Sequence, residues 1–105
     1  MTNSTRLEQL LAYYKEDPND PFNTYGLALE YLKYDLSKAR FYFEELLQDH
    51  PDYLPTYYHV GHLYEELEED DLAIKAYQKG IEIAEAQDNK MTLRELQNAL
   101  NLLDF

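Results

Sequence analysis

Two histidines in the middle of the chain, His59 and His62, stand three positions apart, and Glu66 follows four positions after the second. On a helix, side chains with these spacings lie on one face. Two imidazoles and a carboxylate on one face can hold a zinc-like ion. The pattern differs from the H-E-x-x-H of metalloproteases, because no carboxylate stands between the histidines to act as a base. A metal site is therefore one interpretation of this segment, and a solvated or partner-binding helix face is the other.

Other signatures of catalysis are missing from the sequence. It contains no cysteine, no Gly-rich phosphate loop and no G-x-S-x-G motif, so the common nucleophile and phosphate-binding patterns are excluded. The acidic run Glu65–Asp71 lacks the ligand spacing and the glycine of an EF-hand loop. We therefore expect neither an enzymatic activity nor a cofactor.

The charge of the chain restricts its partners. Its 105 residues include 21 Asp and Glu against nine Lys and Arg, a formal net charge of −12. Such a surface repels phosphate backbones and anionic membranes, and a basic protein or peptide suits it better. The sequence shows no signal peptide and no apolar run of the roughly 18 residues that a membrane span needs. The absence of cysteine suits a reducing compartment, so we expect a cytoplasmic protein.

The elements that must position these residues are helices. The sequence shows helical apolar periodicity throughout and contains a single valine, Val60. A capping box at Thr5–Glu8 marks a first helix, and Asp20 followed by Pro21 marks the start of a second. The helices that we predict cover about 5–17, 21–34, 35–49, 55–67, 70–86 and 90–103. Because the connections are short, successive helices should pack as antiparallel neighbours in an all-α fold.

Two segments of the chain repeat each other. The matching positions are Phe22 and Tyr57, Tyr25 and Val60, Gly26 and Gly61, Leu29 and Tyr64, Ala39 and Ala73, and Phe43 and Tyr77. The first four pairs are 35 positions apart and the last two are 34 apart. Since turns accept insertions and helix interiors resist them, we place one extra residue of the first copy near Tyr34–Asp35.

This order of residues resembles the tetratricopeptide repeat, whose signature is W-x-x-L-G-x-x-Y, then A-x-x-x-F, then Pro. The second copy departs from it with Glu85 in place of the proline, and the last helix has Gln97 in place of the glycine. The resemblance is to a small bacterial-type member of the family, with hairpins stacked in a short right-handed superhelix of about six helices. It implies one domain, 1–105, made of a half-repeat helix at 5–18, repeats at 21–51 and 54–86, and a capping helix at 90–103.

The resemblance also implies a binding groove. In this family the first helix of each hairpin lines a concave groove that binds extended peptides or helices. By position, the groove here would consist of Asn23, Leu27, Glu30, Tyr58, His62, Glu65, Arg94, Asn98 and Asn101. Members that bind the C-terminal carboxylate of chaperones use Lys, Asn and Arg, whereas here only Arg94 is basic. A non-catalytic scaffold for a basic and apolar segment of another protein is therefore the function that the sequence favours.

Two alternatives stay open. The last helix carries Leu102, Leu103 and Phe105 near its end, and these side chains could pair between two copies of the chain, so that the protein is a monomer or a weak homodimer. The other alternative is the metal site at His59, His62 and Glu66, whose spacing is of low specificity.

Overall fold

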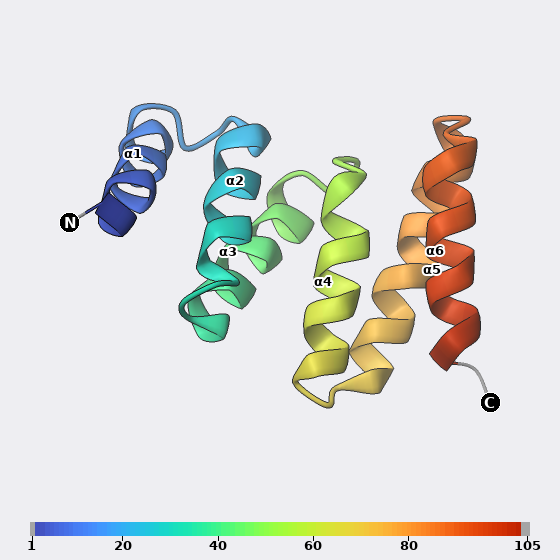
Figure 1. Cartoon of the computed structure of the whole chain (residues 1–105). Coiled ribbons are helices and arrows are strands. Elements are labelled where there is room, and N and C mark those ends of the chain that lie inside the picture. The colour runs from blue at the N-terminus through green and yellow to red at the C-terminus, as the bar shows by residue number, and fades with distance from the viewer. Residues whose placement is uncertain (1, 104–105) are drawn as a thin grey trace. The chain divides into compact units, whose positions relative to one another are not determined.

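The computed structural model describes the backbone of residues 2–103 and the side chains of residues 6–103. All regular structure in that part of the chain is α-helical, which confirms the predicted all-α class (Figure 1). The six helices are α1 (Thr2–Glu16), α2 (Pro21–Tyr31), α3 (Leu36–Asp49), α4 (Pro55–Glu66), α5 (Asp70–Ala86) and α6 (Lys90–Leu103). None of these described helices combines the length and the apolar character needed to cross a membrane.

The helices form two compact units, Met1–Tyr53 and Leu54–Phe105. In the first unit α2 packs against both α1 and α3, and in the second unit α5 packs against both α4 and α6. Figure 1 shows the pairs α2–α3 and α4–α5 as helical hairpins. Short connections therefore join antiparallel neighbours, as the sequence predicts.

Two helix starts follow from their first residues. The Asp20 carboxylate accepts a hydrogen bond from the backbone N–H of Phe22 at 3.0 Å, and Pro21 takes the first helical position of α2. Asp35 caps α3 in the same way, accepting from the backbone N–H groups of the second and third helical residues at 3.0 and 3.2 Å. The prediction for α1 is wrong, because this helix begins at Thr2 and not at Thr5. A capping box at Thr5–Glu8 is compatible with a helix start at Thr5, but it does not prevent the residues before Thr5 from extending the helix toward the N-terminus.

The turns inside the two hairpins differ by one residue. Residues 32–35 connect α2 to α3, whereas only residues 67–69 connect α4 to α5. The extra residue of the first copy therefore lies in the turn, as predicted. The shorter turn uses a left-handed residue, Glu68 with φ of 62°, and the backbone N–H of Glu69 donates to the carbonyl of Tyr64 at 2.8 Å. This is the hydrogen-bond pattern of a Schellman motif, which reverses the chain directly after a helix.

The core lies between the helices of each hairpin and is filled by large side chains. Phe43 and Leu46 are fully buried in the first unit, and Tyr77 and Leu96 are fully buried in the second. Gly80 marks a close approach, because a Cβ atom there would lie 2.6 Å from Cβ of Tyr57 and 2.9 Å from Cδ1 of Leu96. Glycine thus allows α5 to approach α4 and α6 at the same level.

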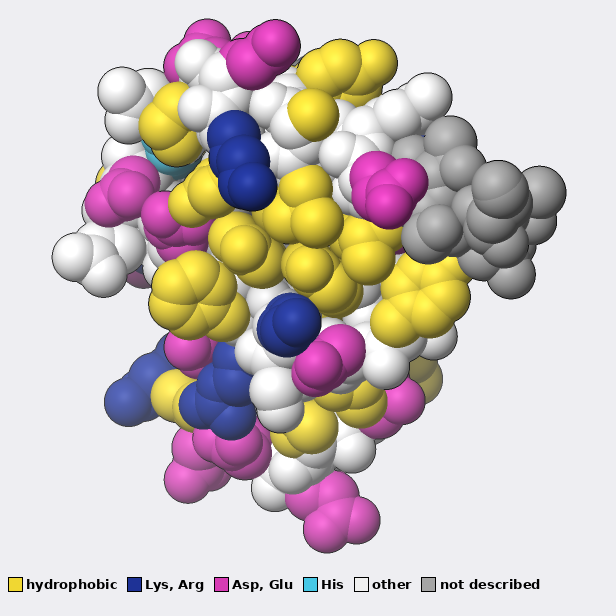
Figure 2. Space-filling model, turned by 90° about the vertical axis from the view of Figure 1, so that its left-hand side faces the viewer, with side chains coloured by type: hydrophobic (Ala, Val, Ile, Leu, Met, Phe, Trp, Pro, Cys, Tyr) yellow, Lys and Arg dark blue, Asp and Glu magenta, His cyan; other side chains and the backbone are white. Residues whose placement is uncertain are grey.

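Most exposed aromatic rings belong to the first unit. Among the described side chains, the large hydrophobic residues that are at least half exposed are Tyr13, Phe22, Tyr34, Phe41, Met91 and Leu102. The four aromatic residues of this set lie in the first unit, and Met91 and Leu102 lie on α6. Figure 2, which views the molecule from the α1 side, shows hydrophobic side chains gathered over the middle of that face with single charged side chains among them. This end of the chain is therefore partly apolar.

Candidate functional site

The candidate site is built on the face of α4 that does not enter the core. Tyr57, Val60, Gly61 and Tyr64 are buried on the inner side of this helix. Tyr58, His62 and Glu65 follow at positions i, i+4 and i+7, so they line one face of it. The His62 side chain is 48% exposed and the Glu65 side chain is 31% exposed, so both are reachable from solvent. The local sequence thus separates a buried stripe from a polar, half-exposed one.

The structure brings these three side chains into contact with a fourth, Tyr77 of α5. The rings of Tyr58 and His62 meet edge to face with centroids 4.5 Å apart, and the His62 ring lies 5.8 Å from the Tyr77 ring. The Tyr77 hydroxyl donates a hydrogen bond to Oε2 of Glu65. The same carboxylate oxygen lies 3.6 Å from Nδ1 of His62. We call Tyr58, His62, Glu65 and Tyr77 the α4–α5 cluster.

Tight packing fixes the position of Tyr77. Its side chain is fully buried, and a Cβ atom added at Gly61 would lie 2.6 Å from Cζ and 2.8 Å from Cδ1 of the tyrosine ring. The ring therefore lies directly over the glycine of α4, and its hydroxyl reaches the polar face. Sequence reasoning assigned Tyr77 to the core aromatic position of the repeat and missed this role. The available signal was the hydroxyl itself, since phenylalanine fills the same position in the first copy.

Burial controls the protonation of two groups in and beside the cluster. Burial, and then the hydrogen bond to Glu65, raise the pKa of Tyr77, so its hydroxyl remains a donor throughout the neutral range. Burial, and then the neighbouring His62, lower the pKa of His59, so its imidazole stays neutral at pH 7. The two histidines therefore differ in burial and surroundings, although their spacing in the sequence suggested a matched pair.

The structure does not assemble the metal site that the sequence left open as an alternative. His59 is half-buried with its ring 5.7 Å from that of Tyr58, whereas His62 is exposed and lies beside Glu65. No group of three His, Cys, Asp or Glu side chains in the described part of the chain is arranged to hold a metal ion. The two imidazoles share a helical spacing, but they differ in burial and in neighbours, so the alternative of a joint site with Glu66 is not supported.

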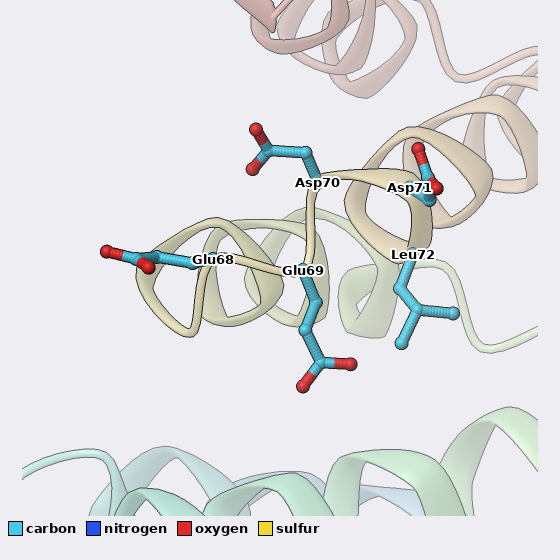
Figure 3. Close-up of a pocket in the computed structure, with 5 residues that line it drawn as sticks. All are labelled: Glu68, Glu69, Asp70, Asp71 and Leu72. Atoms are coloured by element: carbon cyan, nitrogen blue, oxygen red, sulfur yellow. The ribbon is translucent and has the colours of Figure 1, made fainter.

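The acidic turn between α4 and α5 also lacks convergent ligands. Glu68, Glu69, Asp70 and Asp71, together with Leu72, line an open pocket of about 420 Å³. Figure 3 shows that the four carboxylates point in different directions and do not face a common point. Asp70 and Asp71 stand in the first turn of α5, where the positive end of the helix dipole stabilises negative charge.

The three predicted groove residues of the first unit play structural roles. The Asn23 side-chain amide donates hydrogen bonds to the backbone carbonyls of Tyr13 at 3.3 Å and Asp17 at 3.2 Å, which ties α2 to the end of α1. Leu27 is fully buried, and Glu30 is 6% exposed. The expectation that these two line an open groove is therefore wrong. The physical reason is that α2 has packing partners on two sides, α1 and α3, which leaves little of its surface open.

The three predicted groove residues of α6 are open to solvent. Arg94, Asn98 and Asn101 are all exposed and share one face of the helix at positions i, i+4 and i+7. They offer a guanidinium group and two amides as hydrogen-bonding groups. The nine predicted residues are thus divided between the units, with six of them in the second.

The fold and the cluster define an all-α protein of packed helical hairpins with an exposed polar and aromatic helix face. The family model "Tetratricopeptide repeat" matches residues 54–87, which contain α4 and α5. A crystal structure of a tetratricopeptide repeat domain protein from Salinibacter ruber is 48% identical to this chain, with a TM-score of 0.77 and with 81% of this chain and 96% of that chain covered.

A solution NMR structure of a tetratricopeptide repeat domain protein from the same organism is also 48% identical, with a TM-score of 0.80 and coverage of 84% and 90%. None of the curated proteins compared with the chain matches it. The chain therefore belongs to the tetratricopeptide repeat family, whose members generally mediate protein–protein interactions and usually have no catalytic activity.

Proposed function

We propose that this protein is a non-catalytic scaffold that binds a peptide or helical segment of another protein through the exposed face of α4. Tyr58, His62 and Glu65 would make the main contacts, and Arg94, Asn98 and Asn101 of α6 would add hydrogen bonds. The observation that carries the proposal is the α4–α5 cluster. In this cluster the hydroxyl of the buried Tyr77 holds the partly exposed Glu65 carboxylate in place. The paired rings of Tyr58 and His62 lie beside it.

The cluster is suited to binding because its side chains are already positioned. The Tyr58 and His62 rings support each other, and Tyr77 holds the Glu65 carboxylate, so few rotamers have to be fixed when a ligand arrives. Pre-organised groups lower the entropic cost of association. Tyrosine combines a large apolar surface with a polar tip, which favours it at protein interfaces.

The charge of the chain supports a basic partner. The net charge is −12, and Glu65 is the charged group at the centre of the cluster. A Lys or Arg side chain can pair with this carboxylate and lie over the Tyr58 ring, while neighbouring apolar side chains of the partner contact the aromatic edges. Long-range attraction by the acidic surface would also raise the association rate.

The proposal is tested by capture of partners from a cell lysate with three forms of the protein. The wild type is compared with the double variant Tyr58→Ala, His62→Ala and with Tyr34→Ala, an exposed tyrosine of the first unit that serves as the control. All three should show equal melting curves. We expect partners that the wild type and Tyr34→Ala retain and the double variant loses. Equal retention by all three forms would exclude the α4 face.

Self-association is a second candidate, favoured by one observation. Leu102 near the end of α6 is 87% exposed, so it gives this helix an apolar surface that water contacts. Phe105, the third residue of the predicted contact, lies outside the described residues. Sedimentation at rising protein concentration tests this candidate, with Leu102→Glu as the variant. A mass that rises for the wild type and stays monomeric for Leu102→Glu would support it, and a constant monomeric mass for both would end it.

A further inference from the structure

Glu65 has one oxygen engaged and one oxygen open. The Tyr77 hydroxyl and the His62 imidazole both approach Oε2, and no described hydrogen bond or ion pair involves Oε1. The carboxylate is therefore fixed from one side and keeps hydrogen-bonding capacity on the other. A cation that reaches Oε1 would find a prepositioned acceptor beside aromatic rings.

His62 supplies the imidazole of the cluster, and this ring lies beside the Glu65 carboxylate. Imidazole is the side chain whose protonation ordinarily changes between about pH 5 and 8. The titratable groups around it are Glu65, His59 and Tyr58 on its own helix, Glu66 four positions further along the same helix face, and Tyr77 on α5. The Tyr77 hydroxyl stays protonated in this range because burial raises its pKa, and burial lowers the pKa of His59, which disfavours protonation of that imidazole. A proton taken up on His62 therefore faces the Glu65 carboxylate.

We propose that the α4–α5 cluster binds an arginine side chain of the partner at Glu65, and that this guanidinium group competes with the proton of His62. This inference rests on the proposed function, because it names the chemistry and the regulation of the same site. A guanidinium group is favoured over an ammonium group for two reasons. It is planar and can donate several hydrogen bonds to a carboxylate, and its flat face can stack on an aromatic ring. Partner binding would then weaken as the pH falls.

The direction of the effect follows from charge neutralisation. When His62 is neutral, the Glu65 carboxylate carries an uncompensated negative charge 3.6 Å from Nδ1 and attracts the ligand. When His62 is protonated, it forms an internal ion pair with the same carboxylate and also repels a guanidinium group. We expect the affinity for an arginine side chain to fall about 5- to 10-fold from about pH 7.5 to about pH 5.5, at the lower end of typical coupling between two binding events.

The probe is Nα-acetyl-arginine amide, with Nα-acetyl-citrulline amide as the control of equal shape without the charge. NMR shifts of the His62 ring protons and of the α4 backbone report binding at the two pH values. We expect saturable shifts with the arginine probe, weaker at the lower pH, and none with citrulline. Equal responses to the two probes, or an arginine response without pH dependence, would overturn the proposal.

Three variants sharpen this test. Glu65→Gln should abolish the arginine response while its amide oxygen still accepts the Tyr77 hydroxyl, so the fold is kept. In His62→Gln the ratio of the dissociation constants at the two pH values should approach one, whatever the affinity at the higher pH. His50→Gln, at the end of α3 in the first unit, is the matched control and should keep the wild-type ratio. An unchanged ratio in His62→Gln would also overturn the proposal.

The two proposals fail in different ways. If partners are captured through Tyr58 but the arginine probe gives no response, the scaffold function stands and the present inference falls. If capture does not depend on Tyr58, the α4 face is not the partner surface, and the scaffold function proposed for it falls.

Discussion

The hairpins α2–α3 and α4–α5 are built from matching sequences, yet they use the same positions in different ways. Where the second hairpin has His62 and Tyr77, the first has Leu27 and Phe43, both fully buried. Glu30 stands at the position of Glu65, but it is buried and pairs with Lys33 at 3.2 Å. The comparison shows that matching positions are packed into the core of one hairpin and form a polar cluster in the other.

Each unit also contains a tyrosine that donates to a glutamate, Tyr14 in the first and Tyr77 in the second, but the two pairs connect different elements. In the first unit the Tyr14 hydroxyl of α1 lies 2.9 Å from both carboxylate oxygens of Glu45 of α3. In the second unit Tyr77 joins α5 to Glu65 of α4. The first pair fastens the terminal helix of its unit, and the second fixes a carboxylate on an open face. The same chemical pair therefore has a structural use in one unit and is available for binding in the other.

The largest difference between the hairpins should appear at their glycines. A Cβ atom at Gly26 would lie 3.5 Å from Cδ2 of Leu10, an ordinary contact, whereas one at Gly61 would overlap the Tyr77 ring and lie 2.6 Å from its Cζ. Both alanine variants gain up to about 1 kcal/mol from the higher helix propensity of alanine. The difference between their free energies of unfolding therefore reports the steric cost alone. We expect Gly61→Ala to be less stable than Gly26→Ala by up to about 3 kcal/mol. Urea denaturation measures this, and equal stabilities would contradict the described packing.

Exchanging one hydroxyl between the hairpins tests the next difference. Tyr77→Phe removes the donor to Glu65 and should cost about 1–2 kcal/mol. Phe43→Tyr places a hydroxyl on a fully buried ring. Glu30, at the position that matches Glu65, already pairs with Lys33. The new hydroxyl should therefore lower the free energy of unfolding by a similar amount or more. Denaturation of both variants and of the double variant provides the measurement. A stabilised Phe43→Tyr would show that the first hairpin can also hold a phenol–carboxylate pair.

A smaller effect is expected at the helix cap of the first hairpin. Asp35 accepts two backbone N–H groups at the start of α3, so Asp35→Ala should lower the free energy of unfolding by about 1 kcal/mol. Asp35→Asn keeps an acceptor and is the control, with a loss of only a few tenths. Thermal melting distinguishes the two, and equal losses would mean that the carboxylate charge, and not the hydrogen bond, stabilises this end.

The smallest effect at neutral pH concerns ionisation of Tyr14. Burial, and then the hydrogen bond to Glu45, raise the pKa of Tyr14 to about 12. Because this value lies above that of an unfolded tyrosine, about 10, the contribution of the pair is fully present below about pH 10 and is lost as the pH rises through about 12. The stability advantage of the wild type over Tyr14→Phe should therefore shrink over this window. An advantage that persists unchanged above it would contradict the proposed linkage.

The sequence predicted the helices well because their ends carry local signals. Asp20, Pro21 and Asp35 each act where the sequence placed them, and the extra residue of the first copy lies in its turn. These features depend on interactions among neighbours along the chain. The repeat boundaries at 21–51 and 54–86 remain predictions, since helix positions alone do not define where a repeat begins.

The candidate site was only partly predictable, because it depends on contacts between helices. Helical periodicity placed His59 and His62 together on an outer face, but the structure half-buries the first and exposes the second. Leu27 and Glu30 were assigned to a groove by position in the family pattern, and burial excludes them. The role of Tyr77 depends on its packing over Gly61. The sequence pattern predicts that the ring is buried, but it does not predict which surface the hydroxyl of that ring reaches.

The contact between Gly61 and the ring of Tyr77 also limits how this sequence can evolve. A larger residue at position 61 is accommodated better once the ring at position 77 has been replaced by something smaller, because the two compete for the same space. That replacement would also free the carboxylate of Glu65 from its anchor. Substitutions at the two positions are therefore coupled, and a change that removes the overlap by shortening the side chain at position 77 also removes the hydrogen bond that holds the carboxylate in place.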